Sequence, residues 1–555
     1  MSSANGKPDI TPTESKTTST VGNFSHGSRE IPATSAASMA TDRPAKVKRQ
    51  TAGTHVAGKS DSSIVPGKPA NNGSPTVPAE SAEGRGLTKE NIEQSLLDRT
   101  QNRNTDPGSP GFQPRSRGLL GVREAARSDK KLRFTNLLHH ITPELLRASF
   151  FDLKKQAAPG IDGQTWRDYA VDFERRIDDL HARIHRGAYR AKPSKRSYIP
   201  KPDGRMRPLG IAALEDKIVQ QAARTVLECI YERDFLGFSY GFRPGRSQHQ
   251  ALDALFVGIT KRKVNWIVDA DIRGFFDNIN HEWLMKFLEH RIADRRMLRL
   301  LKKWLQAGVS EDGEWSPTKV GTPQGAVISP LYANVFLHYV LDLWINEWRK
   351  RQARGEVIIV RYADDFVIGF REESDARKCL AAMGERLAKF GLELHPDKTR
   401  LIEFGRYAQE CRAKRGDGPP ETFDFLGFTH ISGKTRRGDF TIHRKTSRKK
   451  FQAKLTELKE KLWRNLHADP TRVGGWMQSV FRGWCQYYAV PGNYPRLKQF
   501  RDALQRMWLR VLRRRSQHGR RLTWAKFSQR SKRWLPTPKI LHPYPNVRFA
   551  GQHPR

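Results

Sequence analysis

The pattern of apolar and polar positions divides the chain into unlike parts. The first 85 residues are rich in Ser, Thr, Pro, Gly and Ala and nearly lack aromatic residues. Such a segment cannot bury enough apolar surface to offset the entropy of an ordered chain. We therefore predict a disordered low-complexity arm over residues 1–85 and a linker over residues 86–118. A transit peptide is the alternative, but the arm lacks the Arg-rich amphipathic helix of such peptides.

A folded body is expected to begin at residue 119. Apolar residues recur at helical spacing in LRFTNLLHHITPELLRASFFDLKKQ, and short strands mix with helices up to residue 440. Between residues 441 and 530, FQAKLTELKEKLW and FRDALQRMWLRVLRRR predict amphipathic helices whose outer faces are almost wholly basic. Residues 531–555 form a basic, Pro-rich tail, which we expect to be irregular.

The segment EVIIVRYADDFVIGF predicts a hairpin. Two apolar runs, Val357 to Val360 and Phe366 to Phe370, flank a short polar turn. The tip of this hairpin carries two adjacent carboxylates, Asp364 and Asp365, beside buried strands. Because Asp is common in turns, an ordinary structural turn is the alternative interpretation.

A second segment, KVNWIVDADIRGFFDNINHEWL, places another carboxylate at the end of a strand. Asp271 follows an alternating strand pattern, so its side chain can project into a cleft. Carboxylates from two strand ends can bind two Mg²⁺ ions, which prefer oxygen ligands and stabilise both the attacking and the leaving oxygen of a displacement. Asp269 is the nearest rival, because positions i and i+2 share one face of a strand.

The charge of the chain points to a polyanionic partner. Lys and Arg number 99 against 58 Asp and Glu, a net charge of +41, and nucleic acid fits such an excess best. No apolar run is long enough to span a bilayer, so we expect no membrane partner. The four cysteines are far apart, which argues against a disulfide scaffold or zinc module and favours an intracellular setting.

Ordered motifs give the sequence a specific resemblance. Over roughly residues 119 to 549 the chain resembles group II intron-encoded reverse transcriptases/maturases. The motifs are RSYIPKPDGRMRPLGIAALEDKIVQQA, SYGFRPGRSQHQAL, VDADIRGFFDNI, GTPQGAVISPLYANVFLH, RYADDFVIGF, GLELHPDKT and FDFLGF, in the family's order. The resemblance implies an α+β right-hand polymerase, with fingers and palm over residues 119–440 and a helical thumb, called domain X, over residues 441–530.

The same resemblance implies roles for individual residues. Asp271, Asp364 and Asp365 would be the catalytic, Mg²⁺-binding carboxylates, with Asp365 the more supporting of the three. Residues that would bind the incoming dNTP are the steric-gate ring Phe276, the fingers cations Lys201 and Arg207, Gln324 in the GTPQG block, and Lys398. Plain alternatives remain: core packing for Phe276, a solvated basic turn for the fingers cations, and a surface lysine for Lys398.

The predicted thumb interleaves aromatic and basic residues. In FRGWCQYYAVPGNYPRLKQF, Arg482, Trp484 and Tyr487 suit contacts with RNA by stacking on bases and by pairing with phosphates. Aromatic residues at helical spacing are also common core residues, and we expect about half of these rings to be buried.

These features predict an RNA-directed DNA polymerase that also binds its group II intron RNA to assist splicing and mobility. Its partners would be intron RNA, an RNA template, a DNA primer or target, and dNTPs. No metal-binding Cys/His pattern of an HNH endonuclease is recognisable, so we expect no second-strand cleavage. The alternatives are a maturase without polymerase activity and a domesticated reverse transcriptase in defence or repair. A bacterial, cytoplasmic and nucleoid-associated location is expected, an organellar one less so.

Overall fold

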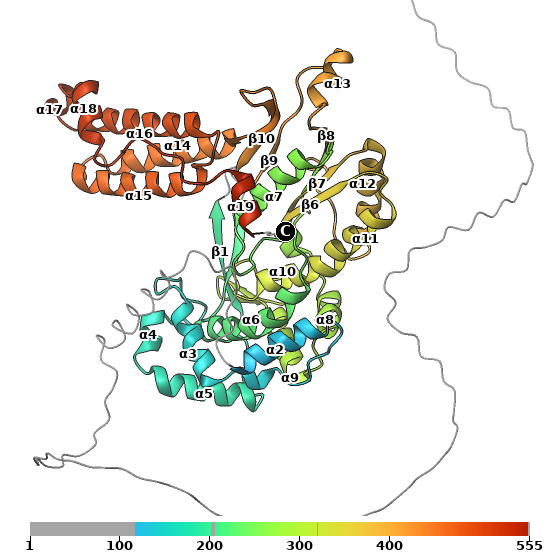
Figure 1. Ribbon diagram of the computed structural model, residues 1–555. Coiled ribbons are helices and arrows are strands. Elements are labelled where there is room, and N and C mark those ends of the chain that lie inside the picture. Colours follow the sequence, from blue (N-terminus) through green and yellow to red (C-terminus); the bar gives the residue numbers. More distant parts are fainter. Residues whose placement is uncertain (1–116, 201–205, 319, 553–555) are drawn as a thin grey trace, which may run out of the picture. The chain divides into compact units, whose positions relative to one another are not determined.

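The computed structural model describes residues 117–200, 206–318 and 320–552. The predicted arm lies outside these residues, as does the predicted linker except for its last two positions. The described residues belong to one compact unit and form helices packed around three sheets (Figure 1). The expected mixture of helices and sheets is therefore present in the described part of the chain.

A four-stranded antiparallel sheet carries the segments that attracted attention in the sequence. Its strands lie in the order β6-β7-β3-β8, and all neighbouring pairs are antiparallel. The bounds are β3 Trp266–Ala270, β6 Val357–Tyr362, β7 Asp365–Phe370 and β8 Arg400–Glu403. The predicted hairpin is confirmed, because β6 and β7 pair directly across a two-residue turn.

Helices cover both faces of this sheet. On one face, α7 packs on β6, and its apolar side chains share a core with those of Ile267, Val360, Val367 and Ile402. On the other face, α12 packs on β3 and β7. These helices span Gln248–Lys261 for α7 and Glu373–Ala388 for α12. Burial on both faces explains why β6 and β7 are nearly continuous apolar runs rather than alternating ones.

A helical layer built around α6 is formed by residues that precede β3 and by residues between β3 and β6. Most of α6 is buried, and α2, α3 and α10 all contact it. The bounds in this part are α2 Arg117–Ser128, η1 Leu138–His140, α3 Pro143–Asp152, α4 Trp166–Ala170, α5 Phe173–His185, α6 Leu214–Asp234, η2 Phe275–Asp277, α8 His281–Glu289, α9 Arg295–Gln306, α10 Ser329–Leu337, the π-helical turn η3 His338–Asp342 and α11 Leu343–Arg351.

The helical pattern read between residues 132 and 156 is only partly correct. A continuous helix does not form, because the carboxylate of Asp294 accepts the backbone N–H groups of Leu137 and Leu138 at 2.8 and 2.9 Å and bends the chain there. The helix α3 starts only at Pro143, where the Thr142 hydroxyl accepts the N–H of Leu145. A long-range polar contact thus overrides the local periodicity.

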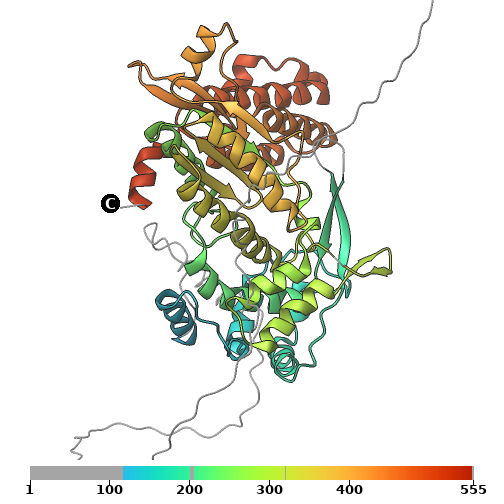
Figure 2. The ribbon, with the colours of Figure 1, turned by 90° about the vertical axis from the view of Figure 1, so that its right-hand side faces the viewer.

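A second sheet has the order β2-β1-β4-β5. Its bounds are β1 Ser194–Pro200, β2 Met206–Ile211, β4 Val309–Glu311 and β5 Glu314–Ser316. The β1 and β2 strands form an antiparallel hairpin that appears as the long blue-green pair in Figure 2. The strand β4 joins β1 in parallel and ties this hairpin to the segment that leads into α10.

The C-terminal part combines a small sheet with a helical bundle. In the sheet the order is β11-β10-β9, and the long helices α14, α15 and α16 lie side by side (Figure 1). The bounds are α13 Ala408–Lys414, β9 Phe423–Phe425, β10 Phe428–Lys434, β11 Phe440–Thr446, α14 Arg448–Arg464, α15 Pro470–Tyr488, α16 Tyr494–Arg515, α17 Gln517–Arg520 and α18 Trp524–Ser531. The two predicted amphipathic helices are confirmed as α14 and α16. Within the described ranges, no helix is both long and apolar enough to cross a bilayer.

The expectation of an irregular tail after residue 531 is wrong for its last part. Residues Pro545–Gln552 form α19, which packs against α7. A buried carboxylate explains this docking: Asp253 of α7 forms ion pairs with both Arg444 of β11 and Arg548 of α19. Because Asp253 and Arg444 are almost fully buried, neither charge can be left without the other.

We predict that Asp253→Asn destabilises the fold. The substitution keeps the shape but leaves two arginines close together without a counter-charge, which costs about 3–5 kcal/mol for a buried pair. Urea unfolding followed by tryptophan fluorescence measures the loss. Glu457→Gln, which removes only the helix-surface pairs with Lys454 and Lys461, should change stability by about 0.5 kcal/mol or less. Equal stability of the two variants would contradict the role assigned to Asp253.

Candidate active site

The tip of the β6–β7 hairpin is a tight turn that presents two carboxylates. Tyr362 pairs with Asp365 across the hairpin, so that Ala363 and Asp364 alone make the turn. Ala363 has φ +58°, in the left-handed region that residues with a Cβ rarely adopt. Its side chain is nevertheless buried, at 4% exposure. The surroundings of the turn must therefore hold it in this conformation.

The strand β3 brings a third carboxylate to the same place. Ala270 pairs with Phe366 in the register of β3 and β7, which sets Asp271 opposite Asp365. The backbone N–H of His395 donates to the Asp271 carbonyl at 2.8 Å and holds the residue just beyond the strand. Asp271 thus stands at a strand end beside the turn, as the sequence predicted.

Asp269, the rival carboxylate, lies on the same face of β3 but one step further from the tip. It pairs with Val367, and its Oδ2 accepts a bond of 3.3 Å from the Nη2 of Arg400. Burial raises the pKa of Asp269 to about 6, against the opposing effect of Arg400. Asp269 therefore already has a cationic partner within the sheet.

Electrostatic repulsion marks the remaining carboxylates as a cluster. Solvent reaches the Asp365 side chain, but protein surrounds it on most sides. This partial desolvation, together with the charges of Asp364 and Asp271, raises the pKa of Asp365 to about 7. Burial and the charge of Asp271 also raise the pKa of Asp364. Mutual destabilisation of this kind is relieved by a cation, and it is characteristic of functional sites.

Two basic side chains offset part of this negative charge. The ammonium group of Lys398 forms an ion pair with Oδ2 of Asp271. The positive charge of Arg207, an exposed residue of β2, acts to lower the pKa of Asp364. The structure thus brings five predicted site residues together: Asp271, Asp364, Asp365, Lys398 and Arg207. Lys201, the other predicted fingers cation, lies outside the described residues.

The donor set of the cluster suits Mg²⁺, which prefers carboxylate oxygens. In the described part of the chain, no three Asp, Glu, His or Cys side chains converge closely enough to hold an ion by themselves. Asp271 is turned toward Lys398 instead. Burial, and after it the charges of Asp364 and Asp271, raise the pKa of Asp365, and a bound cation would oppose this shift. Asp271, Asp364 and Asp365 thus carry the oxygen donors that Mg²⁺ prefers, but in the described residues they do not form a ready-made ion site.

The two predicted residues beyond the sheet lie in a framework around the turn. Phe275 is buried, whereas Phe276 is half-buried, so that Phe275 is the core ring of the two. The carbonyl of Phe276 accepts the N–H of Thr322 at 2.8 Å, and the carbonyl of Gln324 accepts the N–H of Gly210 at 2.8 Å. The GTPQG block is thus fastened to both the segment after β3 and strand β2.

The glycines of this block serve internal packing. A Cβ on Gly321, which has φ +87°, would lie 2.7 Å from the carbonyl oxygen of Asp277. Gly325 has φ +113°, and its added Cβ would lie 3.0 Å from the carbonyl oxygen of Gly210. These two glycines therefore allow close backbone approaches within the protein itself.

The three residues predicted to contact RNA differ in their surroundings. Arg482 is exposed on α15. Trp484 is only 9% exposed, and its ring stacks on Phe500 with centroids 4.2 Å apart, so it has no free face for a base. Tyr487 is half-buried, and its hydroxyl donates to the carbonyl of Leu426 at 2.8 Å. Of the three, Arg482 is the most accessible, Tyr487 is partly accessible and Trp484 is a core residue.

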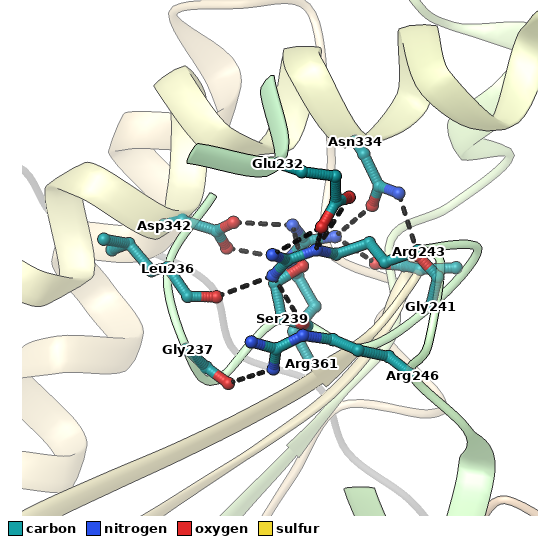
Figure 3. Close-up of polar contacts among 11 residues, drawn as sticks. Glu232, Leu236, Gly237, Ser239, Gly241, Arg243, Arg246, Asn334, Asp342 and Arg361 are labelled. Atoms are coloured by element: carbon teal, nitrogen blue, oxygen red, sulfur yellow. Dashed lines mark hydrogen bonds and ion pairs between the residues drawn. The ribbon is translucent and has the colours of Figure 1, made fainter. Parts of the chain in front are cut away.

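Two features that support the turn were not predicted from the sequence. Arg361, the residue before Tyr362, is fully buried and forms an ion pair with Asp342 (Figure 3). Gly241 lies against the turn itself, because a Cβ on it would be 2.2 Å from the backbone nitrogen of Ala363. An arginine within the apolar run VIIVRY was the available signal for the first feature. Nothing in the sequence pattern identified the neighbours of Gly241.

Comparisons with known protein families agree with this geometry. Residues 199–430 match the family described as "Reverse transcriptase (RNA-dependent DNA polymerase)". This range contains the turn, the end of β3, and the blocks fastened around them.

Individual relatives extend the match beyond that range. Protein YkfC of Escherichia coli K12 is 33% identical over 381 residues, which cover 61% of this chain and 94% of that protein. The group II intron-encoded protein LtrA of Lactococcus lactis is 27% identical over 461 residues, 68% of this chain and 74% of that protein. A putative COX1/OXI3 intron 1 protein of Saccharomyces cerevisiae is 27% identical over 58% of this chain and 46% of its own length.

The close approach of Gly241 to the turn predicts a clear effect of adding one methyl group. Gly241→Ala must displace the backbone at Ala363, and such overpacking costs about 1–3 kcal/mol of folding stability. Thermal unfolding followed by circular dichroism should show a lower melting temperature. Gly237→Ala is the matched control, since a Cβ there meets nothing within 4 Å. A melting temperature of Gly241→Ala equal to that of the control would contradict the packing described.

Proposed function

The chain belongs to the group II intron-encoded reverse transcriptases/maturases, and we propose that Asp271, Asp364 and Asp365 form its polymerase centre. The observation that carries this proposal is the register of β3 and β7, which sets Asp271 opposite Asp365 at the tip of the hairpin. Three carboxylates at one place, with raised pKa values for Asp364 and Asp365, have no evident structural use.

The reaction is the RNA-templated extension of a DNA primer. The primer 3′-oxygen attacks the α-phosphorus of a dNTP and loses its proton, a new P–O bond forms, and the bond to the β-phosphate breaks to release pyrophosphate. Two Mg²⁺ ions, when bound, would supply positive charge at the attacking and leaving oxygens. Asp271 and Asp364 would be direct ligands, and Asp365 would support them. Positioning and electrostatics provide most of the rate in phosphoryl transfers of this type.

Neighbouring residues would bind the nucleotide. Lys398 forms an ion pair with Asp271. In the reaction it would leave this pair and donate a proton to the leaving pyrophosphate. Arg207 acts on Asp364 electrostatically and, with Lys201, would neutralise the triphosphate. The half-buried ring of Phe276 would exclude a ribose 2′-OH. The backbone carbonyl of Gln324 accepts the N–H of Gly210. The side chain of Gln324 would contact the template or nucleotide.

The arrangement of the elements supports the subdivision of a right hand. In this assignment the β2-β1-β4-β5 sheet and the helices around α6 are the fingers, and the β6-β7-β3-β8 sheet is the palm. The helices α14, α15 and α16 are the thumb, or domain X. Their exposed positions are strongly basic on α14 and α16 and include Arg482 on α15. This surface would bind the intron RNA and help it fold, while the RNA supplies the splicing chemistry.

Relatives come from bacteria and from mitochondria. The bacterial, nucleoid-associated location therefore stays a prediction. At the nucleoid the protein would bind its DNA primer or target.

Removing one carboxylate should abolish DNA synthesis without loss of RNA binding. We expect Asp364→Asn and Asp271→Asn to lower dTTP incorporation on poly(rA) primed with oligo(dT) by about 1,000-fold or more, because the site loses charge needed in the transition state. Asp269→Asn should retain most activity, since Asp269 is held by Arg400. Filter binding of the same RNA should be unchanged in all three variants.

Two results would contradict this assignment. Wild-type protein that incorporates no more dTTP than Asp364→Asn over a range of Mg²⁺ concentrations would leave RNA binding as the function. A larger loss in Asp269→Asn than in Asp271→Asn would move the centre to the other strand position.

The basic surface should make RNA binding steeply dependent on salt. Each neutralised phosphate releases counterions, so the logarithm of affinity should fall with the logarithm of salt concentration by a slope of several units. Arg482→Gln should reduce that slope by about one unit if it contacts a phosphate. Arg175→Gln, at an 85% exposed position on α5, serves as the control and should not change it. A flat salt response of the wild type would exclude a phosphate-dominated interface.

A further inference from the structure

A fully buried positive charge lies one residue from the catalytic turn. Arg361 is on β6, and its relative exposure is 0%. A guanidinium group inside a protein is tolerated only when its charge is paired and its donors are satisfied. The partners of Arg361 therefore show what this charge is used for.

All five N–H donors of Arg361 are engaged (Figure 3). The Nε and Nη2 atoms donate to the two carboxylate oxygens of Asp342, which is itself fully buried, at 2.7 and 2.5 Å. The second Nη2 bond goes to the hydroxyl of Ser239 at 2.7 Å. The Nη1 atom donates to Oδ1 of Asn334 at 3.1 Å and to the carbonyl of Ala363 at 2.9 Å. The last of these bonds ends on the catalytic turn.

A π-helical turn places two of these acceptors on one face. In an α-helix, residues eight positions apart stand about 80° apart around the axis. The π-turn His338–Asp342 lies between Asn334 and Asp342 and adds one residue to the turn, which reduces the offset to about 20°. Both side chains can then reach the guanidinium of Arg361 from the same helical segment. Isolated π-turns often occur at functional sites.

The segment that contains Ser239 supports the hairpin from another side. The N–H of Arg361 donates to the carbonyl of Phe238 at 2.9 Å, and the carbonyl of Arg361 accepts the N–H of Tyr240 at 2.8 Å. Gly241 follows and lies against the backbone of Ala363. The left-handed turn is thus fixed by a hydrogen bond to its carbonyl and by close packing against its nitrogen.

We propose that Arg361 is a positioning residue of the polymerase: its bonds to Asp342 and Ala363 set the turn so that Asp364 and Asp365 face Asp271. This inference rests on the proposed polymerase function and deepens it. A lysine at position 361 would keep the charge, but its single nitrogen cannot make the bidentate contact with Asp342 and also reach three further acceptors. The positioning role therefore depends on the guanidinium shape.

The test compares Arg361→Lys with a matched buried pair elsewhere. Arg291 is also almost fully buried and pairs with Asp234 at 3.0 Å, and its Nη1 donates to the carbonyl of Asp129. We expect Arg361→Lys to lower kcat for dTTP on poly(rA)·oligo(dT) by about 100-fold, as displaced catalytic groups do, with KM within about threefold. Binding of that primed RNA, measured by fluorescence anisotropy, should stay within about twofold. Arg291→Lys should retain kcat even where it lowers the melting temperature by as much as Arg361→Lys.

The outcomes separate this inference from the proposed function. Wild type no more active than Asp364→Asn would remove the polymerase function itself. An active wild type with kcat of Arg361→Lys within about threefold of it, or an equal kcat loss in Arg291→Lys, would overturn the positioning role. If Arg361→Lys does not fold, Ser239→Ala tests the positioning role instead, because it removes one hydrogen bond to Arg361. A several-fold fall in kcat at unchanged KM supports the inference, and an unchanged kcat overturns it.

Discussion

The buried ion pair between Arg361 and Asp342 is the constraint around which the site is organised. Neither charge has access to solvent, so each is tolerated only while the other is in place. Meeting this requirement draws together the β6 strand, the α10–η3–α11 helical segment and the loop at residues 238–241. The carbonyl of Ala363 completes the set. The geometry of the carboxylate turn is thus tied to the folding of the core behind it.

Local signals in the sequence were sufficient to find the carboxylates. The hairpin over residues 357–370 consists of two short apolar runs, and the strand before Asp271 has an alternating pattern. These local patterns predict where the strands end. The support behind the turn could not be found in this way. Arg361 meets Ser239, which lies 122 residues away in the sequence, and Asn334 and Asp342, which lie 27 and 19 residues away on a helical segment. Only tertiary structure brings these side chains into contact.

Long-range polar contacts also explain the other differences between expectation and structure. The carboxylate of Asp294 interrupts a segment whose periodicity is helical. The ion pair between Asp253 and Arg548 holds the helix α19, which forms in a tail with the composition of a loop. The sequence left two roles open for Trp484, because helical spacing cannot distinguish a core ring from a ring that stacks on a base. Burial against Phe500 shows that it is a core ring. The proposal assigns RNA binding to the exposed basic positions of α14 and α16, whereas the apolar sides of these helices share one core with β6 and β7.

A double-mutant cycle for nucleotide incorporation tests the central claim most directly. Arg361 and Gly241 contact the turn at different atoms, the carbonyl and the nitrogen of Ala363. The rate constant for single dTTP addition would be measured for wild type, Arg361→Lys, Gly241→Ala and the double variant. If both residues act through the turn, the second substitution adds little, and the double variant loses far less than the product of the single losses. Losses that multiply would show that the two residues act independently and would contradict this account.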